Sequence, residues 1–382
     1  MSEQVRKKKK TKYFFDYTML FIVIFLLLFG LVMLYSTSSY EANIKFEDSA
    51  FYFRKQAIAS AIGIVVMLAI MLLDYHIVQR FAALAYVVSL VLILLVLTPL
   101  GYEAGGARRW LNLGMSLQPA EVAKLALIVF FASVVCRFGE HIKEKRGLII
   151  VLALAIPHSF CVLTITQNLS SAIIIFSIVL MMLFVATPQY KEYFIIAGIA
   201  LVIAVAVVLL VKYDVLPTNL SYRFARIKAW MDPESYAANK GFQTLQALYA
   251  IGSGDIFGKG LGESIQKLGY LPEAQNDMIF SIICEELGLF GAIAIILLFV
   301  LLIWRFMVIA NNAQDKFGAL LVVGVMAHIS IQVILNIAVV TNTIPNTGIT
   351  LPFISYGGSS IVFLLAEMGL VLSVSRSIRL EG

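Results

Sequence analysis

The sequence of 382 residues has few charged side chains and few of the residues that hold metals or form disulfides. Only 14% of its residues are Asp, Glu, Lys or Arg, whereas a typical soluble domain has about a quarter. The three cysteines, Cys136, Cys161 and Cys284, lie in apolar runs without paired spacing, and the four histidines are scattered. This distribution argues against a soluble domain, a disulfide framework and a structural metal site.

Apolar residues, in contrast, are abundant. Hydrophobic residues make up 60% of the sequence, and the mean hydropathy is +0.91. Because a membrane-spanning helix needs about 20 mostly apolar residues, the sequence predicts ten spans and an all-α polytopic membrane protein built as one helical bundle. The predicted spans cover residues 17–37, 57–73, 80–98, 119–136, 148–165, 169–186, 192–212, 278–304, 317–340 and 358–376.

The basic residues are unequally distributed between the two sides of this bundle. Loops on the side of the N-terminus carry sixteen Lys and Arg, and the short loops on the other side carry five. The positive-inside rule therefore predicts cytoplasmic termini and an extracytoplasmic loop over residues 213–277. Residues 1–16 form a basic tail that is expected to contact anionic lipid rather than nucleic acid. Residues 17–382 are expected to form a single transmembrane domain.

A polar, glycine-rich stretch at 252–288 ends where an apolar run begins, and Asp277 stands at that boundary. A carboxylate at the mouth of a membrane helix is a candidate base. The alternative is a helix N-cap, a position that favours Asp. The two roles are compatible because the helix dipole stabilises an ionised carboxylate. Glu273, one turn earlier, is a weaker candidate for acid–base chemistry or sugar binding.

Several cations are candidates for binding an anionic substrate. Arg108 and Arg109 are adjacent, and guanidinium groups bind phosphate through paired hydrogen bonds. Ordinary contact with lipid headgroups is the alternative for these arginines and for Lys55. The candidate cations are Lys55, Arg108, Arg109, Lys259 and Lys267.

Polar residues also occur within and beside the later spans. Glu121 and Lys124 are three residues apart, so on a helix they share a face, and we expect them to face inward and pair. The uncharged segment TNTIPNTGITLPFISYGGSS contains Pro, Gly and hydroxyl residues. It predicts irregular backbone that lines a cavity or is buried in protein. Ser355 and Ser359 are candidate sugar or lipid contacts.

Two further features of the loop region carry predictions. Residues 221–231 have apolar side chains at helical spacing, which indicates a helix that lies on the membrane surface or packs on the bundle. Glu285 and Glu286 follow Asp277 by about two helical turns, roughly 12 Å. They are therefore predicted to be structural or coupling residues rather than sugar ligands.

Three long stretches resemble one family. They read GGARRWLNLGMSLQPAEVAKL, GFQTLQALYAIGSGDIFGKGLGESIQKLGYLPEAQNDMIFSIICEELGLFG and TNTIPNTGITLPFISYGGSS. They are similar to the SEDS proteins, the FtsW/RodA/SpoVE group of bacterial peptidoglycan polymerases. The PEAQND string is closer to the FtsW and sporulation branch than to the elongation branch. Where the family usually has an Asp before the sixth span, this chain has Asn168, which we expect to cap the helix as well.

The resemblance implies an inverting glycosyltransferase that joins lipid II, a lipid-linked disaccharide, into glycan strands outside the membrane. Asp277 matches the family's catalytic aspartate and would be the general base for the acceptor hydroxyl. The candidate cations would hold the leaving pyrophosphate, and Glu121 and Lys124 would order the site. The implied partners are a class B penicillin-binding protein, other division proteins and membrane lipids. A divalent cation, Mg²⁺ or Mn²⁺, that bridges the pyrophosphate and a carboxylate is compatible with this chemistry, and no ligand cluster in the sequence marks a site for it.

Two other classes of function fit the sequence. A lipid II flippase would use many spans, a broken late segment and intramembrane charges. Against a flippase, the sequence has no inverted repeat, and Asp277 is predicted near the surface rather than at the midplane. A non-catalytic scaffold for division enzymes would need only the apolar outer faces of the spans.

Overall fold

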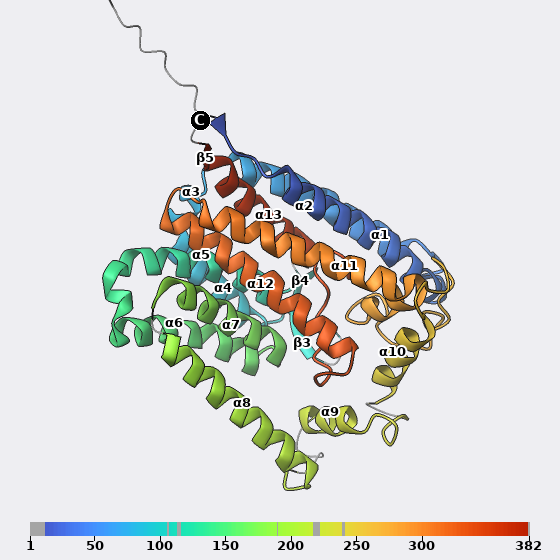
Figure 1. Cartoon of the computed structure of the whole chain (residues 1–382). Helices are drawn as coiled ribbons and strands as arrows, with labels where there is room; N and C mark the ends of the chain where they lie inside the picture. The colour runs from blue at the N-terminus through green and yellow to red at the C-terminus, as the bar shows by residue number, and fades with distance from the viewer. Residues whose placement is uncertain are drawn as a thin grey trace, which may run out of the picture.

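A computed structural model describes residues 12–104, 107–112, 116–188, 190–216, 222–238 and 241–380. Most of the predicted basic tail, residues 1–11, lies outside these ranges. Within them, nine helices are long and apolar enough to cross a membrane, and they form a bundle (Figure 1). They are α1 (Tyr17–Phe46), α2 (Phe51–Leu72), α5 (Pro119–Phe138), α6 (Lys145–Thr164), α7 (Leu169–Ala186), α8 (Tyr190–Lys212), α11 (Ile279–Asn311), α12 (Lys316–Val340) and α13 (Ser359–Ser377).

The third predicted span is shorter than expected. A one-turn helix, α3 (His76–Arg80), precedes α4 (Ala82–Leu95), an apolar helix of 14 residues. After Leu95 the backbone continues in tighter turns, in which Val96 N donates to Ile93 O and Thr98 N to Leu95 O. Pro99 then disfavours any helical continuation. The prediction of an all-α polytopic membrane protein is confirmed, with nine full-length candidate spans in the described residues and one short apolar helix.

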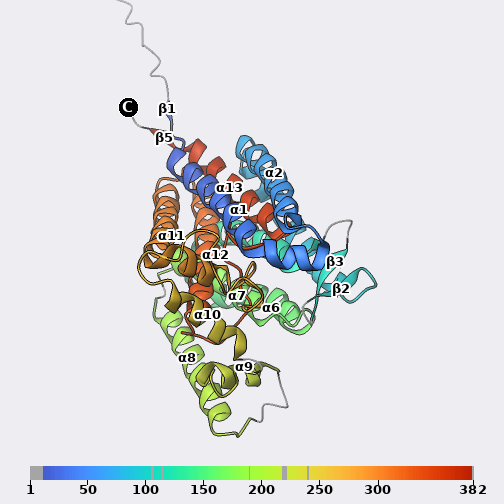
Figure 2. The ribbon, with the colours of Figure 1, turned by 90° about the vertical axis from the view of Figure 1, so that its right-hand side faces the viewer.

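Short β-structure was not predicted, and it occurs at both ends of the bundle. Strands β1 (Lys12–Tyr13) and β5 (Arg379–Leu380) pair antiparallel and hold the two ends of the described chain together (Figure 2). We call this the terminal end. Strands β2 (Gly101–Ala104), β3 (Ala107–Asn112) and β4 (Ser116–Leu117) form an antiparallel sheet. These strands are too short to produce a recognisable alternation of apolar and polar residues.

The centre of the bundle is formed by α5, α12 and α13. Of their most apolar windows, 61%, 67% and 83% respectively are buried, compared with 6% for α8, which lies along the edge of the bundle (Figure 1). Helices α2 and α13 approach closely because glycine faces the neighbouring helix. A Cβ atom added at Gly369 would lie only 2.6 Å from the Met67 carbonyl oxygen. Such close contact through small residues is a common way to pack helices in membranes.

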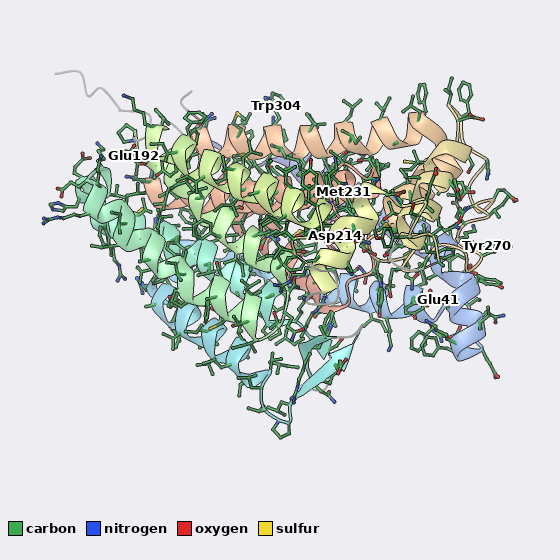
Figure 3. All side chains as sticks on the ribbon, turned by 90° about the horizontal axis from the view of Figure 1, so that it is seen from below. Glu41, Glu192, Asp214, Met231, Tyr270 and Trp304 are labelled. Atoms are coloured by element: carbon green, nitrogen blue, oxygen red, sulfur yellow. The ribbon has the colours of Figure 1, made fainter. Side chains whose placement is uncertain are left out.

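The loop between α8 and α11 contains two helices, α9 (Tyr222–Met231) and α10 (Phe242–Ser253). The helix predicted at 221–231 is therefore confirmed from Tyr222, whereas α10 was not predicted. Figure 3 shows Glu41 and Tyr270 at one end of the molecule and Glu192 at the other. We call the end with Glu41 and Tyr270 the loop end.

The loop also forms backbone hydrogen bonds with α11 where this helix is interrupted. Gly288 has φ 66° and ψ −167°, so the helical hydrogen bonds are interrupted there. Backbone groups of residues 255–260 replace them with four hydrogen bonds: Lys259 N to Glu285 O (2.9 Å), Gly260 N to Glu286 O (3.0 Å), Leu289 N to Asp255 O (2.9 Å) and Phe290 N to Ile256 O (3.1 Å). This exchange satisfies the freed backbone groups, as a membrane-embedded helix requires.

Candidate active site

Asp277 lies at the loop end of the bundle, directly before α11, and its side chain is only 7% exposed. The N-cap of α11 is Met278, and no side chain caps this helix. The N-cap alternative for Asp277 is therefore wrong. Asp277 Oδ1 is buried and has no hydrogen-bond partner among the described residues. Within the described residues, Oδ1 therefore takes no part in a structural hydrogen bond.

The surroundings of Asp277 favour its protonated form. Burial raises the pKa of Asp277 to about 7, and the negative charge of Glu273 acts in the same direction. The nearby charge of Arg226 opposes this shift. Desolvation dominates because a charged carboxylate loses more hydration than a neutral one. A pKa close to neutral suits a general base, which must be ionised to accept a proton and yet basic enough to remove one.

The Asp277 carboxylate faces residues 341–358, which we call the late loop. A Cβ atom built on Gly348 would lie 3.9 Å from Asp277 Oδ2. Gly348 has φ +69°, a conformation that side chains other than glycine rarely adopt. Ile349, Leu351 and Phe353 are 1–6% exposed. The prediction that this irregular backbone is buried in protein is therefore confirmed for most of residues 349–355, whereas residues 341–348 are half-buried or exposed.

Side chains from several helices hold the backbone of the late loop. Gln56 of α2 accepts from the amides of Gly357 and Gly358, at 3.3 and 3.2 Å. The donors to late-loop carbonyls are Ser170 to Thr347 (2.7 Å), Arg226 to Asn346 (3.0 Å), Trp230 to Asn342 (2.9 Å), Gln332 to Thr350 (3.0 Å) and Asn336 to Ile349 (2.7 Å). Because Arg226 and Trp230 belong to α9, this helix packs on the bundle.

Buried polar atoms without a partner gather around this loop. In the part of the chain that the structure describes, they include Asp277 Oδ1, Gln275 Oε1, Asn336 Oδ1, Thr347 Oγ1 and Ser359 Oγ. Hydrogen bonds connect some of these residues to each other and to the late loop, since Asn336 Nδ2 donates to Asp277 O at 2.8 Å and Tyr356 N donates to Gln275 O at 2.9 Å. Most buried polar groups in proteins are satisfied. Such a concentration of unsatisfied ones is typical of a site that binds a polar ligand.

A buried polar network lies next to the site, at the centre of the bundle. Glu121 and Lys124 form the predicted ion pair at 2.8 Å, and both are buried. The pair is extended by Ser360, which donates to Glu121 at 2.8 Å, and by Gln332, which accepts from Lys124 at 3.3 Å. The chain of contacts runs on from Gln332 to His328 (2.9 Å) and from His328 to Glu367 (2.8 Å). Since Gln332 also bonds to Thr350 O, this network is joined to the late loop.

A family model described as "Cell cycle protein", for the FtsW, RodA and SpoVE proteins, matches residues 17–380. The chain belongs to this family. It is 39% identical over 364 residues to stage V sporulation protein E of Bacillus subtilis (strain 168), an alignment that covers 94% of this chain and 97% of that protein. It is 38% identical over 368 residues to the probable peptidoglycan glycosyltransferase FtsW of Trichlorobacter lovleyi, with 96% and 94% coverage. The family resemblance drawn from three stretches of sequence is therefore confirmed.

Solved structures of the family have the same fold. One is a chain from "Structural coordination of polymerization and crosslinking by a peptidoglycan synthase complex", with a TM-score of 0.77, 26% identity, and coverage of 95% of this chain and 98% of that chain. Another is the rod shape determining protein RodA of Thermus thermophilus, with a TM-score of 0.68, 25% identity, and coverage of 96% and 98%. The family fold thus extends over almost the whole chain.

In this family member, the predicted substrate-binding cations Arg108, Lys259 and Lys267 bond to oxygen atoms of the protein. Arg108 donates to the carbonyl oxygens of Gly101 (3.0 Å) and Thr98 (2.5 Å), so its guanidinium group fastens the β2–β3 hairpin. Lys259 pairs with Glu285 at 2.7 Å, and Lys267 pairs with Glu286 at 2.8 Å. These ion pairs join the loop to α11 beside its break. They confirm the structural interpretation of the two glutamates.

The other predicted site residues differ in their placement. Lys55 is exposed, and its ammonium group lies 4.3 Å from the Phe51 ring centroid. Arg109 is half-buried on β3. Glu273 is close enough to influence the charge of Asp277. Ser355 Oγ accepts from the Leu351 amide at 2.8 Å and so stabilises a turn of the late loop itself.

The sequence reasoning missed the buried amides that hold the late loop, Gln56, Gln332 and Asn336. They are 2%, 3% and 0% exposed. A signal was present, because Gln332 and Asn336 are four residues apart in a predicted span and therefore share one helix face. Polar side chains inside a span face the bundle and mark functional regions. Asn168, in contrast, caps α7 as predicted, since its side chain accepts from the Ser171 amide at 3.0 Å.

Proposed function

We propose that this chain is a peptidoglycan glycosyltransferase that polymerises lipid II on the extracytoplasmic face of the bacterial cytoplasmic membrane, in division or sporulation. The names of its full-length relatives support the activity. The observation that carries the mechanism is the buried Asp277 carboxylate, which has one oxygen without a partner in the described residues and a pKa of about 7.

In the proposed reaction, Asp277 removes the proton from the acceptor sugar hydroxyl. The hydroxyl oxygen forms a bond to the anomeric carbon of the donor while the bond from that carbon to the lipid pyrophosphate breaks. The proton resides on Asp277, the electron pair leaves with the pyrophosphate, and the configuration at the anomeric carbon inverts. One base is sufficient for this displacement.

The departing pyrophosphate gains negative charge, which cations at the loop end stabilise. We assign this role to Arg109 of β3 and Lys55 of α2, two of the cations that the sequence predicts for it. Glu121 and Lys124 order the site through two neighbours. Ser360, which bonds to Glu121, comes directly after the late loop, and Gln332, which bonds to Lys124, also bonds to the loop itself. In the described residues there is no group of three or more His, Cys, Asp or Glu that could hold a metal ion. A divalent cation would therefore take most of its ligands from pyrophosphate and water.

The distribution of basic residues supports an orientation with cytoplasmic termini and Asp277 outside. The structure is consistent with this orientation, because the two ends of the described chain pair at the terminal end and Asp277 lies at the loop end. The solved relative belongs to a peptidoglycan synthase complex that couples polymerization with crosslinking. We therefore propose a class B penicillin-binding protein and other division proteins as partners.

Asp277→Ala tests the proposal. The full-length protein is purified, reconstituted in lipid vesicles with lipid II, and assayed for glycan strands on gels. Loss of a general base is expected to reduce polymerisation by about 10²–10⁴-fold. Asp232→Ala is the matched control, because Asp232 is an exposed aspartate of the same loop whose side chain accepts only from Ser235. Its activity should equal that of the wild type.

The same preparation separates the proposal from a flippase and from a scaffold. A flippase would move fluorescent lipid II across the vesicle membrane without forming glycan strands, and Asp277→Ala would not change the rate of movement. A scaffold would bind its partners without polymerising lipid II in any variant. Either result, or unchanged polymerisation by Asp277→Ala, contradicts the proposed function.

A further inference from the structure

We propose that Asn336 of α12 is a positioning residue that sets the direction of the Asp277 carboxylate by holding its backbone against the late loop. This inference rests on the proposed function of Asp277 as the base. Asn336 lies in the interior of the bundle, and its loss should have a measurable effect on the chemical step.

The first support is the geometry of the Asn336 amide. Its Nδ2 atom donates to Asp277 O at 2.8 Å and to Ile349 O at 2.7 Å. One nitrogen therefore uses both of its hydrogens, one on the residue with the candidate base and one on the late loop. Asn336 is 0% exposed. Water therefore does not replace these bonds easily, and the relative position of the two segments is fixed.

The second support is that few other contacts orient the Asp277 side chain. Met278, not Asp277, is the N-cap of α11, and Asp277 Oδ1 has no hydrogen-bond partner in the described part of the chain. The direction of the carboxylate therefore depends on where the backbone of Asp277 is held. Gly348, the neighbour of Ile349, is the residue that Oδ2 faces. Fixing Ile349 and Asp277 to one amide thus keeps the carboxylate directed at this part of the loop.

A neighbouring amide provides an internal comparison. Gln332, one helical turn before Asn336, donates to Thr350 O at 3.0 Å. It anchors the next residue of the late loop and, among the hydrogen bonds of the described residues, makes none to Asp277. Gln332 also accepts from Lys124 at 3.3 Å, so its loss disturbs the loop and the Glu121–Lys124 network but leaves the backbone of Asp277 held by Asn336. If Asn336 positions the base, its loss will be more severe and will change the acid–base behaviour of the reaction.

The experiment compares Asn336→Ala, Gln332→Ala and Ser330→Ala in the full-length protein reconstituted with lipid II. Ser330 lies on the same helix, and its hydroxyl donates to Met326 O, four residues earlier, its one side-chain hydrogen bond within the described residues, so Ser330→Ala should match the wild type. Asn336→Ala is expected to lower kcat by about 10–100-fold with less than a twofold change in KM, because misplacing a base affects the chemical step. Gln332→Ala should have the smaller effect on kcat.

The pH profile is the readout that a merely structural role would not change. Without Asn336 the carboxylate gains contact with water, so the acidic limb of the kcat profile should move to lower pH. A second variant, Asn336→Ser, retains one small donor and should give an intermediate kcat. It replaces the alanine variant if that protein does not fold.

Asp277→Ala and the double variant Asp277→Ala/Asn336→Ala complete the test. If Asn336 acts through Asp277, removing it from a protein without the base should have no further effect on the residual rate. The inference is overturned if Asn336→Ala matches Ser330→Ala, if the acidic limb does not move, or if the two losses multiply. The proposed function itself fails only if Asp277→Ala polymerises like the wild type, so the two failures are distinguishable.

Discussion

The buried glutamates of this protein and its buried Asp277 are in opposite electrostatic situations. Glu121, Glu285 and Glu286 each lie within 2.8 Å of a lysine nitrogen. Asp277 is equally removed from water, but no cation pairs with it in the described residues, and one of its oxygens has no partner. The glutamates therefore hold helices and loop together, whereas the aspartate remains available to accept a proton. Burial alone does not distinguish the two roles, whereas the presence or absence of a paired cation does.

The largest effect is expected from breaking a paired carboxylate. Lys124→Ala leaves Glu121 buried without its cation, which should reduce the free energy of unfolding by about 3–5 kcal/mol. Thermal unfolding followed by tryptophan fluorescence measures this loss. Replacing both partners, as Glu121→Gln/Lys124→Met, should recover most of the stability because no unpaired charge remains. A single variant as stable as the double one would contradict the comparison.

Removing the charge of the unpaired Asp277 carboxylate is expected to increase the free energy of unfolding rather than reduce it. The pKa of Asp277 is raised from 3.8 to about 7, so the folded state binds a proton more tightly than the unfolded state does. The protein therefore loses stability as the pH rises from about 4 to 7. Asp277→Asn removes this penalty and should increase the free energy of unfolding by on the order of 4 kcal/mol at pH 8. Near pH 4 the two proteins should differ little, and equal stability at both pH values would argue against the shift.

The activity of the wild type should follow the same ionisation. Only the ionised Asp277 accepts a proton, so polymerisation should fall about tenfold per pH unit below 7, or about 100-fold at pH 5. Initial rates with lipid II at saturating concentration, between pH 5 and 8.5, measure this limb. A rate that is constant from pH 5 to 8 would show that Asp277 does not titrate during the reaction.

The smallest effect is expected at Asn168. Its side chain caps α7, at a position where the family resemblance leads us to expect Asp. Because Asp and Asn are about equally good N-caps, Asn168→Asp should change the free energy of unfolding by less than about 0.5 kcal/mol. Polymerisation should also remain at the wild-type rate. A large change in activity with unchanged stability would mean that this position takes part in the reaction.

Several features could be predicted because they depend on neighbours in the chain. The Glu121–Lys124 pair follows from a spacing of three residues on one helix, and the Asn168 cap follows from its place before an apolar run. The partners of Lys259 and Lys267 could not be predicted in this way. They lie 26 and 19 residues away on α11. Their approach depends on the break at Gly288, which allows the loop to bond to the helix.

The order of residues along the chain is enough to predict a bundle of apolar helices and to place Asp277 where one of them begins. Both follow from local composition, since backbone groups in a membrane must be satisfied within each helix. The packing of the helices, in contrast, sets which carboxylates acquire a cation and which amides hold the late loop against Asp277. Those contacts join residues that are distant in the chain, such as Asn336 and Asp277 or Gln56 and Gly358. They exist only once the helices have packed, because no local pattern specifies which buried faces will meet.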